Sequence, residues 1–243
     1  MTNGKKEEEN KMPKFENDSY DSVKKQITMR LVNERVGREF FKEVPQRKIE
    51  DLAIMYQVIP PETGKEELGT FIITNTIMGN WGVNEQELHE VAMKNTKEVS
   101  KPVFSSMESI IDTLMEDKES VNLLQEQSEF TPPEDMKKEM FVLTNERKSF
   151  GATMMLYPEV LSEISEIMQG EYYILPSSIH ELIIVSKDAK FSPKELGKMV
   201  REINRSQVEP KERLSDRVYE YNKETKNVQQ VMESIERHRR DER

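Results

Sequence analysis

Short apolar runs that interleave with amphipathic helices constrain the fold of this chain most strongly. Four runs, bounded by turn residues, predict buried strands: DLAIMYQVI (51–59), MFVLTN (140–145), YYIL (172–175) and LIIV (182–185). Residues 217–222 (RVYEYN) alternate apolar and polar side chains and predict a further strand. Because strands and helices do not follow a regular β-α-β order, the sequence predicts an α+β fold with a mostly antiparallel sheet and packed amphipathic helices. A shared strand-then-helix order leaves open whether the chain contains two similar halves.

Capping patterns predict where several helices begin. A residue that can cap a helix is followed three positions later by glutamate in three places: Asn84 with Glu87, Ser105 with Glu108, and Ser192 with Glu195. Pro193 stands at the first position of the last of these helices, where proline is favoured. Another helix is predicted over 158–170, with proline in its first turn and glycine as its stop.

Other segments are assigned from apolar spacing alone. A helix is predicted from Asp21 up to Pro45, because apolar residues recur there at helix-like intervals: Val23, Ile27, Leu31, Val36, Phe40, Phe41 and Val44. GTFIITNTI (69–77) predicts a strand paired antiparallel with 51–59, and GATMMLY (151–157) fits either a strand or a helix. The spacing of Val228, Met232 and Ile235 predicts a helical tail.

The elements predict a chain divided at an acidic, proline-containing and weakly periodic segment. The expected parts are a disordered charged tail (1–18), an N-terminal α+β half (19–115), an acidic linker or excursion (116–138), a C-terminal α+β half (139–228) and a charged helical tail (229–243).

Composition restricts the classes of function. The formal charge of −10 argues against nucleic acid as a partner, since phosphates would be repelled. The absence of cysteine excludes disulfides, thiolate metal sites and a cysteine nucleophile. The N-terminal residues lack an apolar signal region and no later run is long enough to span a membrane, so we expect a cytoplasmic protein with no membrane association.

The Pro-Ser-Ser-Ile-His-Glu segment (176–181) is the most unusual feature with a possible chemical role. A hydrolase-like reading makes Ser178, His180 and Asp216 the catalytic group. Against it, Glu181 follows His180 directly and would point to the opposite face of a strand. The chain also lacks a Gly-x-Ser-x-Gly elbow, and serine after proline commonly bonds local backbone. The sequence therefore favours a structural turn.

Metal and cofactor sites are not predicted. The three histidines, His89, His180 and His238, do not pair at ligand spacing, and no glycine-rich phosphate loop is present. The single tryptophan, Trp81, is expected to pack as a lid on the core, with an exposed ligand platform as the alternative. The candidate ligand or partner surface comprises four residues: Asn75, Trp81, Ser177 and Tyr219.

Several segments together resemble a clostridial family catalogued as a domain of unknown function, number 5688. They are LVNERVGREFFKEVPQRKIEDLAIMY, NTIMGNWGVNEQELHEVAMKNT, FVLTNERKSFGATMMLYPEVL, YYILPSSIHELIIV and LSDRVYEYNKET. The resemblance covers roughly residues 27–228 and implies that the 176–181 turn belongs to the family pattern. It also implies genes near mobile elements, and a longer region before the first helix that this chain replaces with a short charged tail. It implies no activity.

Two functions remain open. The leading hypothesis is a non-enzymatic accessory or protein-interaction module with an unidentified protein partner, encoded by a mobile element. The alternative is a hydrolase-like or small-ligand-binding enzyme whose pocket lies near residues 176–181.

Overall fold

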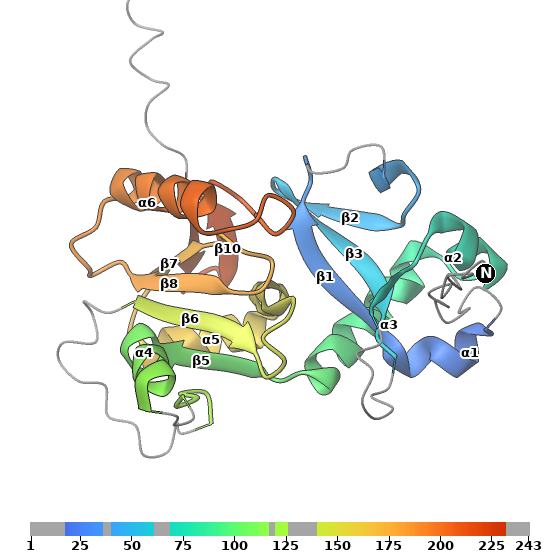
Figure 1. Ribbon diagram of the computed structural model, residues 1–243, viewed down its shortest axis with the longest axis horizontal. Helices are drawn as coiled ribbons and strands as arrows, with labels where there is room; N and C mark the ends of the chain where they lie inside the picture. The colour runs from blue at the N-terminus through green and yellow to red at the C-terminus, as the bar shows by residue number, and fades with distance from the viewer. Residues whose placement is uncertain (1–17, 36–39, 61–68, 117–119, 126–139, 232–243) are drawn as a thin grey trace, which may run out of the picture.

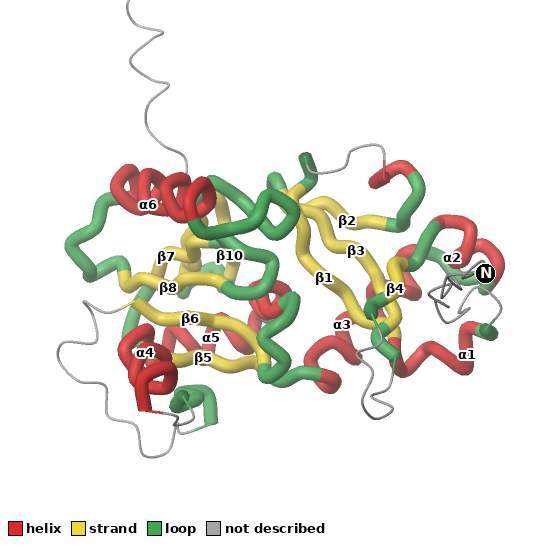
Figure 2. The backbone as a smooth tube through the Cα atoms, in the orientation of Figure 1, coloured by secondary structure: helices red, strands yellow, loops and turns green. Residues whose placement is uncertain are grey.

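The computed structural model describes residues 18–35, 40–60, 69–116, 120–125 and 140–231. Its strands form two antiparallel sheets, one of four strands and one of six, with helices packed around them (Figures 1 and 2). This arrangement confirms the predicted α+β class.

The N-terminal sheet is built around one buried strand. Strand β3 (Leu52–Val58) is buried at every position, as predicted, and lies between β1 (Ile27–Asn33) on one side and β2 (Gln46–Ile49) on the other. The short β4 (Phe71–Ile72) also pairs antiparallel with β3, which confirms the predicted hairpin partner.

The predicted helix over 21–44 is wrong. The chain forms only α1 (Tyr20–Val23) and a turn of 3₁₀-helix, η2 (Lys24–Gln26), before it enters β1; η3 (Phe40–Lys42) follows later. Ile27, Met29 and Leu31, at every second position, belong to the main apolar core, and this spacing is the period of a strand. A spacing of four residues fits nearly one helical turn and also two strand periods, so Val23, Ile27 and Leu31 could not separate the two structures. Val36 lies outside the described residues.

Three smaller predictions also differ from the structure. The strand expected over 69–77 ends after β4, because the Thr74 side chain accepts the Ile77 N–H and starts α2 (Asn75–Asn80). Helix α4 (Met107–Glu116) is capped by Ser106, whose hydroxyl accepts the Ser109 N–H; Ser105 lies in the preceding strand. The expected helical tail is a strand where it is described, since β10 (Asn227–Gln230) pairs with β9. Met232 and Ile235 lie outside the described residues.

The C-terminal sheet has the strand order β10-β9-β7-β8-β6-β5. It consists of β5 (Pro102–Ser106), β6 (Met140–Asn145), β7 (Tyr172–Leu175), β8 (Leu182–Ser186), β9 (Tyr219–Asn222) and β10. Strands β6 to β9 confirm predicted strands, whereas β5 was not predicted and β10 stands where a helix was expected. Because β5 and β6 are paired neighbours in one sheet, the two sheets divide the chain between β4 and β5 and not at the segment between β5 and β6. Most of residues 116–138 lie outside the described residues. The sheets differ in strand number and order.

Helices cover both faces of the C-terminal sheet (Figure 1). Helix α5 (Pro158–Ile167), preceded by the 3₁₀-helix η5 (Gly151–Leu156), packs on one face, and α6 (Pro193–Ser206) packs on the other. The predicted capping boxes at α6 and at α3 (Glu85–Val99) are both present. No helix in the described parts of the chain is long and apolar enough to cross a membrane.

Helix α3 is attached by side-chain hydrogen bonds to the backbone of the edge strand β1 and of the η2 turn before it. The buried Asn95 amide donates to the carbonyl oxygens of Lys24 and Ile27, at 2.7 and 2.9 Å. The Met29 N–H donates to the Thr96 hydroxyl at 2.9 Å. One apolar core extends from β1 and α3 through β6 and α5, so the two sheets share it.

The substitution Asn95→Asp is expected to destabilise the fold by at least about 2 kcal/mol, because it aims a buried carboxylate at two carbonyl oxygens. The loss grows as the pH rises, since only the ionised form is repelled. Urea unfolding at pH 4.5 and pH 8 measures it. Asn227→Asp, on the exposed β10, is the control and should change stability by less than about 0.5 kcal/mol. An Asn95→Asp protein as stable as the wild type at pH 8 contradicts this account of the α3–β1 contact.

Candidate functional site

The 176–181 turn joins β7 to β8 and is held by hydrogen bonds within the turn and by contacts with residues 212–213. The Ser178 hydroxyl accepts the His180 N–H at 3.0 Å, and Ser178 forms an isolated bridge with Arg213. The neighbouring Ile179 N–H donates to the Glu212 carbonyl at 2.9 Å. Ser178 therefore makes the kind of contact that a structural turn requires.

The His180 ring is half-buried between an aromatic ring and a carboxylate. Its Nδ1 accepts the Phe150 N–H at 3.3 Å, and the two rings lie 5.6 Å apart. Its Nε2 lies 3.8 Å from the Glu212 carboxylate. Acceptance at Nδ1 places the proton of the neutral imidazole on Nε2, which faces Glu212. The acidic neighbour of His180 is thus Glu212, which the sequence interpretation did not select.

The three residues of the hydrolase-like hypothesis have different partners. Exposed Asp216 accepts a hydrogen bond from the Asn204 amide at 2.6 Å. None of the hydrogen bonds or ion pairs found among the described residues joins Asp216 to His180, or the Ser178 hydroxyl to the His180 ring. Ser177 is buried and takes part through its backbone: its carbonyl oxygen accepts a hydrogen bond from the Leu214 N–H at 3.1 Å.

Gly151 allows the loop that carries Phe150 to approach the turn. Phe150 has a left-handed backbone with φ of 54°. A Cβ on Gly151 would stand 2.5 Å from the His180 carbonyl oxygen and would also overlap the Thr144 hydroxyl. Thr144 donates its hydroxyl to that same carbonyl at 2.8 Å. Three elements, β6, η5 and the turn, therefore meet without room for a side chain.

The other predicted surface residues have structural contacts. Trp81 packs partly buried against the core and donates its indole N–H to the Asp18 carbonyl at 2.8 Å, as expected of a lid. The Asn75 amide donates to the Lys42 carbonyl at 3.0 Å. Tyr219 is buried and donates its hydroxyl to Asp51.

The Asp51 carboxylate joins the two sheets. It lies in the turn between β2 and β3 and accepts hydroxyl protons from Tyr219 and, at 2.8 Å, from Ser215. Arg217 Nε approaches it at 3.5 Å. Burial, and then the hydrogen bond to Asp51, raise the pKa of Tyr219 far above its ordinary value, so this phenol is a hydrogen-bond donor and not a nucleophile.

A second network, which the sequence did not reveal, joins β2 and β3 to the first turns of α3. The buried Tyr56 hydroxyl donates to Glu85 and lies 3.2 Å from His89 Nδ1, while Arg47 bonds Glu85 at 2.9 Å. Burial opposes ionisation of Glu85, but the hydrogen bonds from Arg47 and Tyr56 outweigh it and lower the pKa of this carboxyl. Burial and Arg47 lower the pKa of His89. Each charged group here has a partner, which is typical of a structural network.

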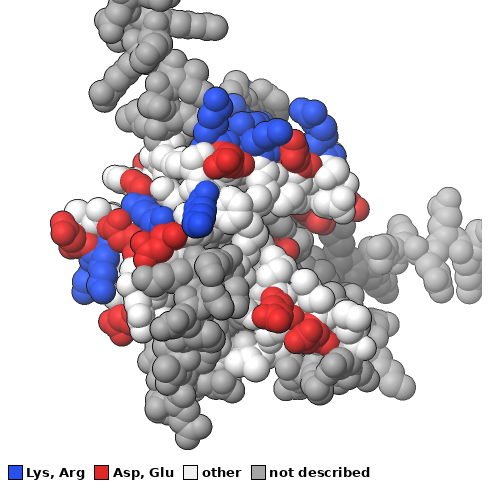
Figure 3. Space-filling view, turned by 90° about the vertical axis from the view of Figure 1, so that its left-hand side faces the viewer, with Lys and Arg blue, Asp and Glu red and all other residues white. Residues whose placement is uncertain are grey.

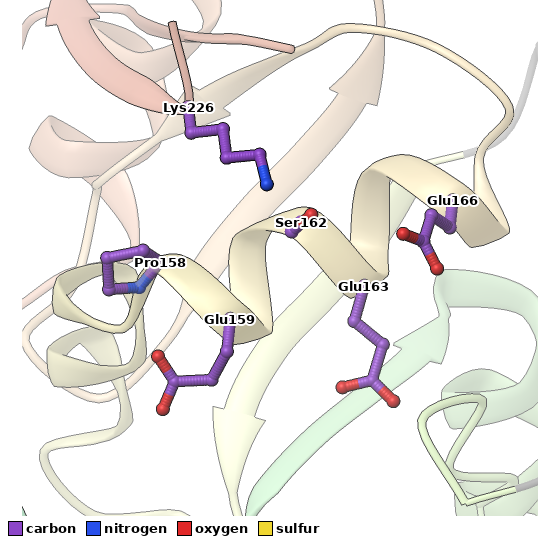
Figure 4. Close-up of a pocket in the computed structure, with 6 residues that line it drawn as sticks. All are labelled: Pro158, Glu159, Ser162, Glu163, Glu166 and Lys226. Atoms are coloured by element: carbon purple, nitrogen blue, oxygen red, sulfur yellow. The ribbon is translucent and has the colours of Figure 1, made fainter. Parts of the chain in front are cut away.

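An open groove of about 590 Å³ runs along α5 (Figure 4). It is lined by Pro158, Glu159, Ser162, Glu163, Glu166 and Lys226. Burial and the adjacent Glu166 raise the pKa of Glu163. Within the described segments no three histidine or acidic side chains are grouped closely enough to hold a metal ion.

A stripe of basic side chains runs along the exposed side of α6. Lys194, Lys198, Arg201 and Arg205 are exposed and spaced by four, three and four residues, which places them on one helix face. We call these four residues the basic stripe. Figure 3 shows lysine and arginine side chains gathered at the top of the molecule, where α6 lies. The buried side of the same helix carries Leu196 and Val200.

Comparison with protein families gives one match. The model described as a family of unknown function, DUF5688, matches residues 1–223 of the 243. The chain belongs to this family. No curated protein and no solved structure matches it.

In this DUF5688 chain, Gly151→Ala is expected to destabilise the fold by about 2–4 kcal/mol, because the added methyl overlaps two elements that cannot both move away. Chemical denaturation measures the change. Gly79→Ala is the matched control, since a Cβ on Gly79 meets nothing within 4 Å; it should be neutral or slightly stabilising. Equal stability of the two variants contradicts the close approach described for the turn.

Proposed function

We propose that this protein is a non-enzymatic accessory module of a bacterial mobile element that binds an acidic protein partner in the cytoplasm. The basic stripe on α6 carries the proposal. The chain has a net charge of −10, yet one helix face carries four exposed positive side chains, so positive charge is concentrated there. They extend for about 16 Å along the helix at 1.5 Å per residue, which is the reach of a short acidic segment.

The placement of the stripe supports a role in association. The apolar side of α6 is fixed on the C-terminal sheet through Leu196 and Val200, so its opposite side is presented rigidly. The Lys198 side chain is 75% exposed and only loosely paired with Glu202, at 3.7 Å. Opposite charge on a partner would increase the rate of encounter and fix its orientation.

A hydrolase-like or small-ligand-binding enzyme near residues 176–181 is the second candidate. The half-buried His180 beside Glu212 favours it, because a carboxylate can orient a general base. The engagement of Ser178 with the turn backbone weighs against it, since that contact occupies the proposed nucleophile.

The test of the interaction is a charge-reversal variant in which Lys194, Lys198, Arg201 and Arg205 are all changed to glutamate. The partner captured from the native host by the wild-type protein should bind this variant at least about tenfold more weakly. Wild-type affinity should also fall between about 50 and 300 mM salt, as expected when exposed charges are screened. Titration calorimetry with the purified partner measures both effects.

The matched control reverses four exposed lysines on other elements: Lys25, Lys94, Lys223 and Lys226. It changes the net charge by the same amount and should retain most of the affinity. If both variants lose affinity equally, the effect is one of net charge, and the basic stripe is not the binding surface. Turnover of ester or amide substrates that disappears in Ser178→Ala would support the enzyme instead.

A further inference from the structure

Four polar side chains share the face of the N-terminal sheet that points away from the main core. The register places Thr28 opposite Gln57, and places Arg30 and Gln46 on either side of Met55. Side chains two residues apart in a strand lie on the same face, so these four residues surround Met55. We call this group, with Met55 at its centre, the Arg30 face.

The Arg30 face holds most of the buried polar side-chain atoms that lack a hydrogen-bond partner. Six such atoms occur among the described residues, and four of them belong to this face: Thr28 Oγ1, Arg30 Nε, Gln46 Oε1 and Gln57 Oε1. Thr28 and Gln57 are each only 1% exposed. Buried polar groups in folded proteins are nearly always paired, so a cluster of unpaired ones calls for a polar partner that the described residues do not supply.

Arg30 is the only charged member of this set, and its guanidinium has an aromatic partner in place of an acidic one. Its Cζ lies 5.3 Å from the centre of the Phe150 ring. Among the ion pairs of the described residues none involves Arg30, whereas Arg47 on the same sheet is paired with Glu85. Burial lowers the pKa of Arg30, which reflects the loss of water around the cation. Arginine nevertheless stays protonated, so the face keeps one uncompensated positive charge.

Apolar residues complete the surroundings. Val32, Ala53, Met55 and Ile72 lie on the same face and form an apolar cluster with Phe41 and Val44. A ligand that suits this face therefore has one anionic group for the guanidinium, a polar atom for Thr28 or Gln57, and an apolar body for the cluster.

We propose that the Arg30 face binds a small organic carboxylate with an apolar body. A single guanidinium balances one negative charge, and its planar fork matches the two oxygens of a carboxylate. A phosphate dianion would leave a negative charge uncompensated among neutral amides and a hydroxyl. This site lies on the N-terminal sheet, whereas the basic stripe lies on α6, which packs on the C-terminal sheet. The two proposals are therefore independent and can be tested separately.

The test titrates the full-length protein with acetate, hexanoate, benzoate and inorganic phosphate, and detects binding by protein-observed NMR and calorimetry. Saturable binding of hexanoate or benzoate is expected, at least about tenfold tighter than binding of acetate or phosphate. In Arg30→Met, binding of these carboxylates should fall at least about tenfold, and Arg30→Lys should retain part of it. Benzamide, which lacks the charge, should not bind.

Unfolding of the ligand-free variants distinguishes a binding residue from a structural one. Arg30→Met removes a partly buried charge without an acidic partner and should raise the melting temperature, because replacing such a charge with an apolar side chain is stabilising. The matched variant Arg47→Met breaks the contact with Glu85 and should lower it. A lower melting temperature in Arg30→Met would make Arg30 structural and overturn the proposal.

Two further results overturn the carboxylate site. One is that none of the probes binds saturably, which would mean that water, and not a carboxylate, hydrogen-bonds to the polar groups. The other is that phosphate binds as tightly as hexanoate and benzoate, which contradicts the charge match. Neither result bears on the α6 charge-reversal experiment.

Discussion

The contact on which the rest of the structure depends is that between α3 and the outer edge of β1. An edge strand presents backbone groups that lack a neighbouring strand. Here Asn95 and Thr96 supply the missing partners, since they bond the Ile27 carbonyl and the Met29 N–H. Toward the C-terminal sheet, the Met93 carbonyl of the same helix accepts the Tyr157 hydroxyl at 2.8 Å. The same helix therefore closes one sheet and connects it to the other, so that both share a core.

The 176–181 turn contributes to the contact between the two sheets. Its His180 holds the backbone of Phe150 through Nδ1, and the Phe150 ring lies between the His180 ring at 5.6 Å and the Arg30 guanidinium at 5.3 Å. The turn in the C-terminal sheet thus positions an aromatic side chain against a charged one in the N-terminal sheet. The feature that resembles a catalytic serine and histidine in the sequence contributes here to the surroundings of Arg30.

The predictability of each element follows from how local its determinants are. The capping boxes of α3 and α6 lie within four residues of chain, and both were predicted correctly because nothing distant decides them. Strand β1 was predicted as a helix because Val23, Ile27 and Leu31 stand four apart, which suits both periods. What decides for the strand is the pairing with β3, which lies some twenty residues later. Likewise, β10 forms a strand because it pairs antiparallel with β9.

The candidate sites depend on still longer separations. Glu212 and His180 are 32 residues apart in the sequence, and Asp51 and Tyr219 are 168 apart. No local sequence motif can therefore predict either pair. The basic stripe is the exception, since its spacing within α6 is visible in the sequence once the helix is placed. Arg30 is the opposite case. The chain has 46 acidic residues and 36 lysines and arginines, so from the sequence alone every arginine could have an acidic partner. Only the folded arrangement reveals an arginine that the surrounding described carboxylates leave unpaired, and that exception is what makes it informative.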